Sequence, residues 1–300
     1  MKNLQRFGLL LLAVVLIFTL TACGDKKNGV DDNAVIAKFD GGEVTKKDFD
    51  TYMGIAYFFD PTLKQYLNTV DEEQQIAVFD AYLGAYIGER YLANQLADSK
   101  DLEKKAENTL KIFKDKMIDQ LGSSKNYNDA LKAEKITGDD LLDYMVRYYK
   151  AEEYLVSKAY NENKEIFSIA TVSHILIGKD SRTDDEAKTL AQELLNQLKA
   201  GADFADLARE YTDDEGSKDS GGVYEDVPVA IWVPGFMEAA INLPVGELSE
   251  LVKTDYGYHI IKVLKRELPE LKDVTDDGRN IVFSSAYTDF ITDELEKILR

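Results

Sequence analysis

The sequence of 300 residues predicts an α+β protein, in which a small domain of short strands and helices lies between helical segments from both chain ends. Three observations predict this class. Apolar residues recur at helical spacing from Asp71 to Tyr160. Short strand-like runs then alternate with helices and with glycine and proline turn signals from Ile166 to Glu267. A helical apolar stripe returns from Asp276 to Arg300.

The first residues predict a secretion signal followed by a lipid anchor. A basic start precedes the apolar run Leu9 to Leu20, which is short for a membrane span and ends in small residues, as is typical of a signal peptide. Leu20-Thr21-Ala22-Cys23 resembles the lipobox of bacterial lipoproteins, and this resemblance implies cleavage before Cys23 and diacylglycerol on its sulfur. We expect a signal peptide over 1–22, a lipidated tether over 23–33 and a place on the extracytoplasmic face of a cell membrane. A plain signal peptide with an incidental cysteine is the alternative.

Composition argues against several classes of function. The formal net charge of −19 disfavours sequence-independent nucleic-acid binding, which needs a basic surface. The only cysteine stands at the lipidation position, which leaves no disulfide and no thiol nucleophile. Two histidines without cysteines or nearby carboxylates at ligand spacing make a metal site a weak interpretation. We therefore expect neither a metal nor another cofactor.

Residues 34–164 are expected to form a mostly helical lobe. "AVIAKFDGGEVTKKDF" predicts two short strands joined at Gly41-Gly42, and Thr45 with Asp48 is typical of a helix start. "GSSKNYND" predicts a break between two later helices. Two apolar stripes mark helix faces: Ile76, Phe79, Leu83, Tyr86 and Ile87, and, after a cap at Thr137, Leu141, Met145 and Tyr148.

Residues 268–300 are expected to end in a helix that packs on this lobe. Its stripe is long enough to need an apolar partner, and consists of Tyr287, Phe290, Ile291, Leu295 and Ile298. The lobe would then be formed by both chain ends. A homodimer through the helical lobe is an open alternative.

The two histidines lie in β-branched runs that predict buried strands. Strand alternation places His174 with Val172 and Leu176, and places His259 with Ile261 and Val263. Each imidazole therefore points toward an apolar interior, where a histidine is more often a satisfied core residue than a base or a ligand. A Ser–His hydrolytic pair remains an alternative by spacing, although the sequence has no Gly-x-Ser-x-Gly elbow.

Three segments around these histidines resemble parvulin-type peptidyl-prolyl isomerases. "VSHILIG" resembles their opening strand, "FADLAREYTDDEGSKDSGG" their helix and glycine loop, and "VPGFMEAAINLPVGELSELVKTDYGYHIIKV" their last helix and closing hairpin. The resemblance spans Ile169 to Arg266. It implies a small central antiparallel sheet with surrounding helices over 165–267. A lipoprotein with such a domain between helical ends resembles the PrsA-type foldases.

The resemblance assigns site residues position by position. It implies a polar set made of His174, Asp214, Thr254 and His259. It implies an apolar cup for the proline ring made of Tyr224, Trp232 and Phe236, and a variable pocket position at Tyr256. The usual Gly-Gly-Asp-Leu-Gly reads Gly221-Gly222-Val223-Tyr224-Glu225, and the usual Gly-Gln-Met reads Ala230-Ile231-Trp232. We therefore expect a loop of different shape from Glu225 to Ile231, with an effect on substrate preference. Phosphate specificity is not expected, because the loop after the first histidine strand, "GKDSRTDDEA", contains only two basic residues, Lys179 and Arg182, among four acidic ones.

The sequence thus favours a lipid-anchored peptidyl-prolyl isomerase and foldase that acts on unfolded or partly folded secreted proteins with Xaa-Pro bonds. A holdase chaperone, whose isomerase-like domain binds with little turnover, is the main alternative. A solute-binding lipoprotein shares the lipobox, but it predicts two similar α/β lobes, which the helical half does not fit.

Overall fold

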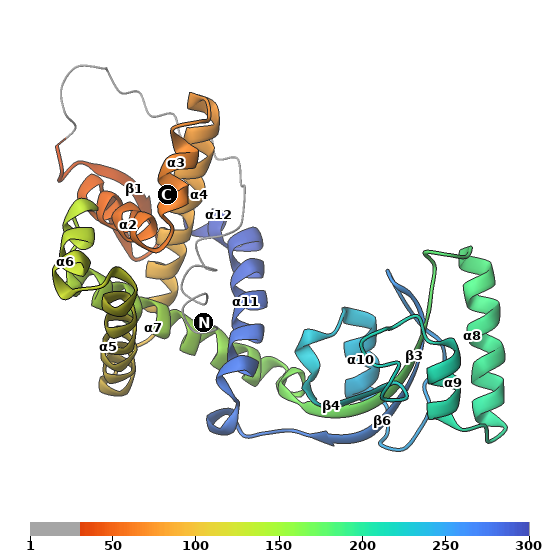
Figure 1. Ribbon diagram of the computed structural model, residues 1–300. Coiled ribbons are helices and arrows are strands. Elements are labelled where there is room, and N and C mark those ends of the chain that lie inside the picture. Colours follow the sequence, from red (N-terminus) through yellow and green to blue (C-terminus); the bar gives the residue numbers. More distant parts are fainter. Residues whose placement is uncertain (1–30, 300) are drawn as a thin grey trace. The chain divides into compact units, whose positions relative to one another are not determined.

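The computed structural model describes residues 31–299. The predicted signal peptide, Cys23 and most of the predicted tether lie outside these residues. The described chain forms two compact units. One comprises the residues up to Leu155 together with those from Phe283 onward, and the other is Val156–Val282 (Figure 1). Within residues 31–299, none of the helices combines the length and the apolar character needed to cross a membrane.

The first unit is mostly helical and is made from both ends of the described chain, as predicted. A hairpin of β1 (Val35–Phe39) and β2 (Gly42–Thr45) opens it. The following helices are α2 (Lys46–Phe59), α3 (Pro61–Leu67), α4 (Glu72–Ala93), α5 (Lys100–Leu121), α6 (Ser124–Ala133) and α7 (Gly138–Glu162). The chain returns to this unit through α11 (Asp276–Asp293) and α12 (Leu295–Ile298).

Local signals explain where these helices begin and end. Thr45 and Asp48 form the predicted capping box at the start of α2. Gly122, with φ +80°, ends α5 in the left-handed conformation that glycine adopts without strain. The predicted break in "GSSKNYND" is confined to Gly122 and Ser123, because the Ser123 side chain already caps α6. The rest of that segment is helical.

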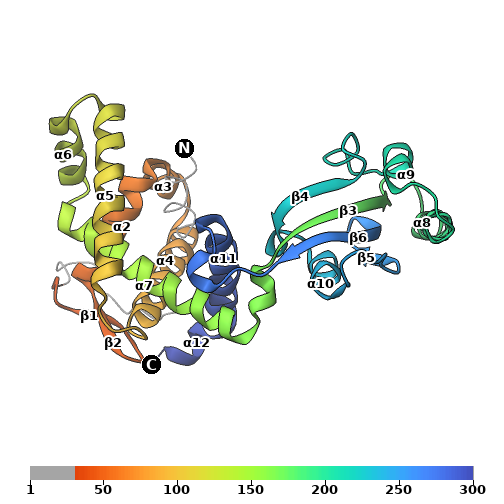
Figure 2. The same ribbon diagram turned by 90° about the horizontal axis from the view of Figure 1, so that it is seen from below.

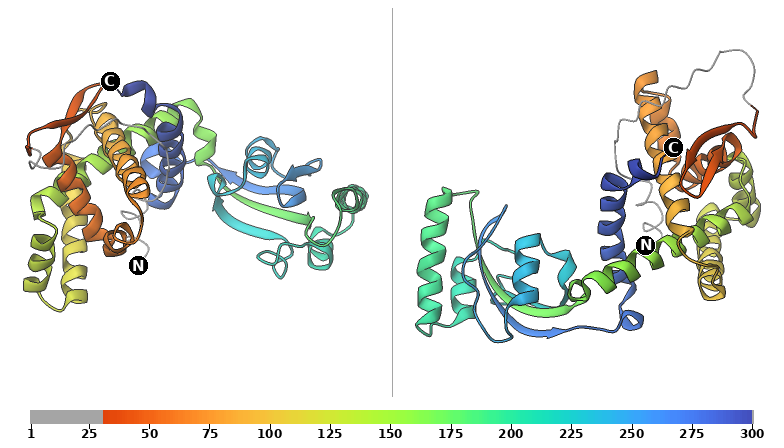
Figure 3. Two further views of the ribbon diagram at one scale, coloured as in Figure 1. Left: turned by 90° about the horizontal axis from the view of Figure 1, so that it is seen from above. Right: turned by 180° about the vertical axis from the view of Figure 1, so that it is seen from behind.

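The C-terminal helices pack on α4, and the predicted stripe is buried in full. The Tyr287 hydroxyl donates a hydrogen bond to the Ala85 carbonyl at 3.2 Å, and the Phe290 ring stacks on Tyr91 with centroids 5.8 Å apart. Figure 3 shows α11 beside α4. On α4 itself Leu83, Tyr86 and Ile87 of the stripe are buried, Phe79 is half-buried, and Ile76, near the start of the helix, is 50% exposed.

The second unit is built on a four-stranded antiparallel sheet in the order β4-β3-β6-β5 (Figure 2). The strands are β3 (Ile169–Gly178), β4 (Val223–Pro228), β5 (Val252–Thr254) and β6 (Gly257–Glu267). The two central strands pair along their whole length, from Ile169 opposite Glu267 to Gly178 opposite Gly257. The predicted α+β class is therefore confirmed, with the two histidine-bearing strands adjacent at the centre of the sheet.

Helices cover both faces of this sheet. Helices α8 (Asp184–Lys199) and α9 (Phe204–Tyr211) pack on the face that carries Ile175 and Ile260. Helix α10 (Pro234–Asn242) packs on the opposite face against Val172 and Ile261. Three short 3-10 helices complete the unit: η1 (Lys164–Phe167), η2 (Val229–Ile231) and η3 (Leu271–Asp273). The face under α10 is the one to which alternation assigned both histidines.

The segment predicted as an altered loop, Glu225 to Ile231, is instead the second half of strand β4 followed by η2. Ile169 pairs with Pro228 and Ala170 with Val227, which extends the sheet. Pro228 is tolerated because β4 is an edge strand. A bulge lies nearby, where Asp226 has φ +48° and its amide donates to Thr171 Oγ1 at 3.1 Å.

Candidate active site

His174 and His259 lie side by side on the two central strands. His174 is placed by β3 and His259 by β6, and their rings are stacked at 20° with centroids 5.8 Å apart. Both side chains are buried, at 4% exposure. The Phe236 ring, from α10, meets each imidazole edge-on at 5.3 Å. The strand register thus brings together the only two imidazoles of the chain.

Asp214 anchors the His174 imidazole. It lies in the turn after α9, where the Asp213 amide donates to the Leu176 carbonyl at 2.8 Å and ties the turn to β3. Asp214 Oδ2 lies 2.9 Å from His174 Nε2 and also accepts hydrogen bonds from the hydroxyls of Ser217 and Tyr224. The hydrogen bond from His174, more than any other contact, holds the pKa of Asp214 well below its usual range. An ionised carboxylate only accepts, so His174 carries a proton on Nε2.

His259 is held by Thr254. Its Nε2 lies 2.8 Å from Thr254 Oγ1, and the Tyr256 amide donates to the same oxygen at 3.2 Å. Burial, and then the charge of His174, lowers the pKa of His259 to about 4, so the ring is neutral at pH 7. The Nδ1 atoms of both histidines are buried and have no hydrogen-bond partner among the described residues.

An apolar cup stands over the histidine pair. The Tyr224 ring, from β4, stacks on His174 at 29° with centroids 5.4 Å apart. The ring centroids of Trp232 and Phe236 lie 4.9 Å apart, and Phe236 is only 3% exposed. Val229 and Ala240 lie behind the cup and are fully buried. Seven of the eight predicted site residues outside the lipobox therefore meet in one cluster.

Tyr256 is the exception. It lies in the turn between β5 and β6, is 62% exposed, and makes no ring contact with the cluster among the described residues. In the loop expected to lack phosphate specificity, one of the two basic side chains is already engaged within the domain. Arg182 donates to the Gly178 carbonyl at 2.9 Å and pairs with Asp213.

The sequence reasoning missed Ser217 and the polar role of Tyr224. Ser217 is fully buried and lies 3.0 Å from His174 Nε2. Its position three residues after Asp214 fits a turn, but nothing in an acidic, serine-containing loop distinguishes one buried hydroxyl from the solvated ones. Tyr224 was assigned for its ring alone, and its hydroxyl turns out to lie 3.0 Å from Asp214 Oδ2.

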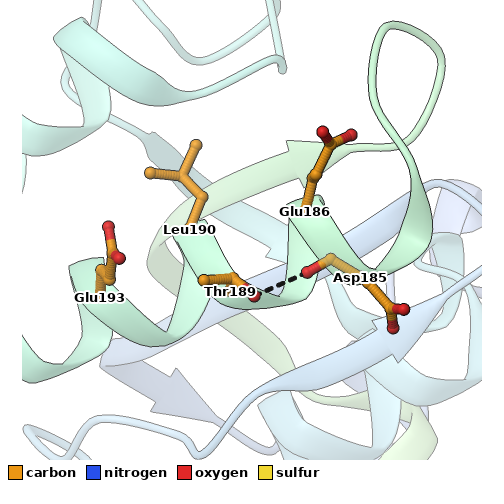
Figure 4. A pocket seen from close by; sticks show the side chains of 5 residues that line it. All are labelled: Asp185, Glu186, Thr189, Leu190 and Glu193. Atoms are coloured by element: carbon orange, nitrogen blue, oxygen red, sulfur yellow. Dashed lines mark hydrogen bonds between the residues drawn. The ribbon is translucent and has the colours of Figure 1, made fainter.

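Other parts of the described chain offer less. No group of histidine, cysteine and acidic side chains within residues 31–299 could hold a metal ion. A shallow depression of about 320 Å³ lies along α8, lined by Asp185, Glu186, Thr189, Leu190 and Glu193 (Figure 4). Its residues all come from one helix, and two of them serve the helix itself, since Glu186 caps it and the Thr189 hydroxyl bonds to the Asp185 carbonyl. The histidine cluster carries the more specific chemistry.

Comparison with known proteins finds relatives along most of this chain. Residues 154–267 match the family described as the PPIC-type PPIASE domain. The foldase protein PrsA of Caldanaerobacter subterraneus is 27% identical, over 96% of this chain and 94% of that protein. The foldase protein PrsA of Clostridium botulinum strain 657 is 30% identical, over 91% of this chain and 88% of that protein. A crystal structure titled peptidylprolyl isomerase (PrsA), from Bacillus cereus, is 24% identical and covers 89% of this chain and 92% of its own, with a TM-score of 0.47.

Proposed function

We propose that this chain, which belongs to the PrsA family of foldases and contains a parvulin-type peptidyl-prolyl isomerase domain, is a lipid-anchored enzyme on the extracytoplasmic face of a cell membrane that isomerises Xaa-Pro bonds in secreted proteins. The observation that carries the catalytic part is the cup of Tyr224, Trp232 and Phe236 over the stacked pair His174 and His259.

The cup suits the reaction because no covalent bond breaks. An Xaa-Pro amide resists rotation by roughly 18–20 kcal/mol, since rotation removes its resonance. The twisted amide is less polar than the planar one, so a dry apolar pocket favours it over the ground state. Phe236, at 3% exposure, and the fully buried Val229 behind it keep water from that side of the cup.

The polar residues would serve as a fixed floor. Asp214 and Thr254 each hold one histidine, and the low pKa values of Asp214 and His259 keep their protonation constant near neutral pH. Such a floor sets the field at the substrate carbonyl without moving a proton during the reaction. We assign His174, Asp214, Thr254 and His259 this shared role, and Tyr256 a position at the mouth of the pocket, where its exposed ring would meet the chain next to the proline.

The membrane part of the proposal rests on the sequence. Lipidation of Cys23 after removal of residues 1–22 would anchor the protein through a tether over 23–33. The helical lobe, 34–164 with 268–300, would then bind unfolded clients, and the isomerase domain, 165–267, would act on their Xaa-Pro bonds. Replacement of Cys23 by alanine tests the anchor. The variant should leave the membrane fraction, and its retention there would contradict the proposal.

The isomerase is tested on soluble protein that starts at Gly24. Wild type should accelerate cis–trans exchange in a series of Xaa-Pro peptides, and Trp232→Ala should lose most of this rate while near-UV circular dichroism shows an intact fold. Wild type that accelerates no peptide, but suppresses aggregation of an unfolded client, would instead identify a holdase.

A further inference from the structure

Three hydrogen-bond donors converge on a single oxygen beneath the cup. Asp214 Oδ2 accepts from His174 Nε2 at 2.9 Å, from the Tyr224 hydroxyl at 3.0 Å and from the Ser217 hydroxyl. The donors come from three different segments: β3, β4 and the turn after α9. Three hydrogen bonds to one oxygen restrict rotation of the Asp214 carboxylate, and they hold the three donor side chains in place as well.

The chain makes room for the Tyr224 hydroxyl at one glycine. A Cβ atom added to Gly216 would lie only 2.6 Å from that hydroxyl oxygen. Gly216 has an ordinary negative φ, so the backbone itself does not require glycine there. The Tyr224 ring cannot easily retreat from such a Cβ, because it is stacked on His174. Space, rather than backbone conformation, therefore explains the glycine.

The same loop is clamped to the histidine strand. The His174 amide donates to the Gly222 carbonyl at 2.8 Å, and a Cβ on Gly222 would lie 2.3 Å from the His174 carbonyl oxygen. Gly222 has φ +85°, which L-residues with a side chain rarely adopt. This close approach delivers Tyr224, two residues later, directly onto the His174 ring.

We propose that Tyr224 and Ser217 are positioning residues of the isomerase site, which act through Asp214 to fix the tautomer and orientation of His174, and that Gly216 is the space that allows Tyr224 to do so. The inference rests on the proposed function for its effect on rate, but its structural part stands on the contacts alone. Burial, and then the hydrogen bond to Asp214, raises the pKa of Tyr224, which keeps the hydroxyl protonated as a donor.

A purely apolar role for Tyr224 predicts something different. If only the ring matters, Tyr224→Phe changes nothing, because the ring and its stacking remain. If the hydroxyl contacts substrate directly, Tyr224→Phe raises KM. If it acts through Asp214, the loss appears in kcat with KM unchanged, since the pocket keeps its shape.

The experiment is a double-mutant cycle on the soluble chain from Gly24, with peptide isomerisation and histidine NMR as separate readouts. Tyr224→Phe and Gly216→Ala should each lower kcat by roughly tenfold, as expected for a lost hydrogen bond to a charged group. The double variant should be no worse than Tyr224→Phe alone, because phenylalanine has no hydroxyl for the new methyl group to displace. Ser217→Ala should act in the same direction as Tyr224→Phe.

The NMR readout separates failure of this inference from failure of the proposed function. The ¹⁵N signals of His174 report its tautomer whether or not the protein is active. In Tyr224→Phe and Ser217→Ala the Nε2 proton should exchange faster with water than in wild type. His174 signals that are unchanged in both variants, or additive losses in the double variant, would overturn the inference. If wild type is inactive but the His174 signals still change in Tyr224→Phe and Ser217→Ala, the isomerase proposal is overturned. The inference that Tyr224 and Ser217 position His174 through Asp214 then still holds.

Discussion

A buried carboxylic acid in the helical unit should make stability depend on pH, and Glu89→Gln isolates its effect. Glu89, on α4, is 1% exposed and accepts a hydrogen bond from the Tyr52 hydroxyl at 2.9 Å. Its Oε2 has no partner among the described residues, and neither does the buried Nε of Arg147 on α7. Two further buried tyrosines, Tyr144 and Tyr287, face the same site and stay neutral, because burial raises their pKa values well above 10.

The size of the effect follows from the pKa of Glu89. Burial raises it from 4.5 to about 7, against the opposing influence of Arg147 and then of the Tyr52 hydrogen bond. Below pH 4.5 Glu89 is protonated in both the folded and the unfolded chain, so its contribution to the free energy of unfolding is fully present. Between pH 4.5 and 7 the unfolded chain loses the proton while the folded chain keeps it, so stability falls as pH rises. At about 1.4 kcal/mol per pH unit, the whole window is worth about 3 kcal/mol.

The assay is urea unfolding of wild type and Glu89→Gln between pH 4.5 and 8. Because the chain has two units, helical content should be followed for both units together, and fluorescence of Trp232, the only tryptophan, reports unfolding of the second unit alone and serves as an internal standard. As pH rises across this range, the free energy of unfolding of the variant should increase by about 3 kcal/mol relative to that of wild type. The control Glu107→Gln, on the exposed side of α5, should gain nothing. Free energies of unfolding that change equally with pH in wild type and in Glu89→Gln would refute the reasoning.

Two other predictions concern the isomerase unit. Activity should fall as pH drops from about 5 toward 4, because His259, with its pKa lowered to about 4, then becomes charged within the dry pocket, and activity that stays unchanged down to pH 4 would contradict this. Gly257→Ala should destabilise the unit by about 2 kcal/mol or more, because Gly257 has φ +145° and a Cβ there would lie 2.2 Å from the Ile177 carbonyl oxygen. Gly201→Ala is the control within the same unit, because Gly201 also has a positive φ, +99°, but a Cβ there has no atom within 4 Å; equal losses in both variants would refute the steric argument.

The elements that sequence predicted well are those with a strong local signal. The helical stripes, the capping box at Thr45 and the α+β class all follow from spacing and cap chemistry over a few residues. Period-two alternation also placed both histidines on the correct face of the sheet, because a long strand pair such as β3 and β6 leaves the register little freedom.

The parts that sequence could not predict depend on contacts between distant segments. The resemblance implied a loop from Glu225 to Ile231, yet its first part, to Pro228, becomes strand because β3 offers an edge to pair with. Tyr224 was expected to contribute only a ring. The partner of its hydroxyl, Asp214, is brought near by the clamp at Gly222, which no periodicity in the sequence encodes. The resemblance to parvulins supplied the site residues, and the structure supplied their hydrogen bonds.

The most direct test of the central claim is exchange NMR of a proline peptide at equilibrium with a small amount of the soluble chain. Uncatalysed exchange takes tens to hundreds of seconds, so exchange peaks between the cis and trans forms are absent without an enzyme. The account predicts such peaks with wild type and with the surface control Lys188→Ala, and their loss with His259→Ala while the chain stays folded. Equal exchange with wild type and His259→Ala, or none with wild type on any peptide, would contradict it.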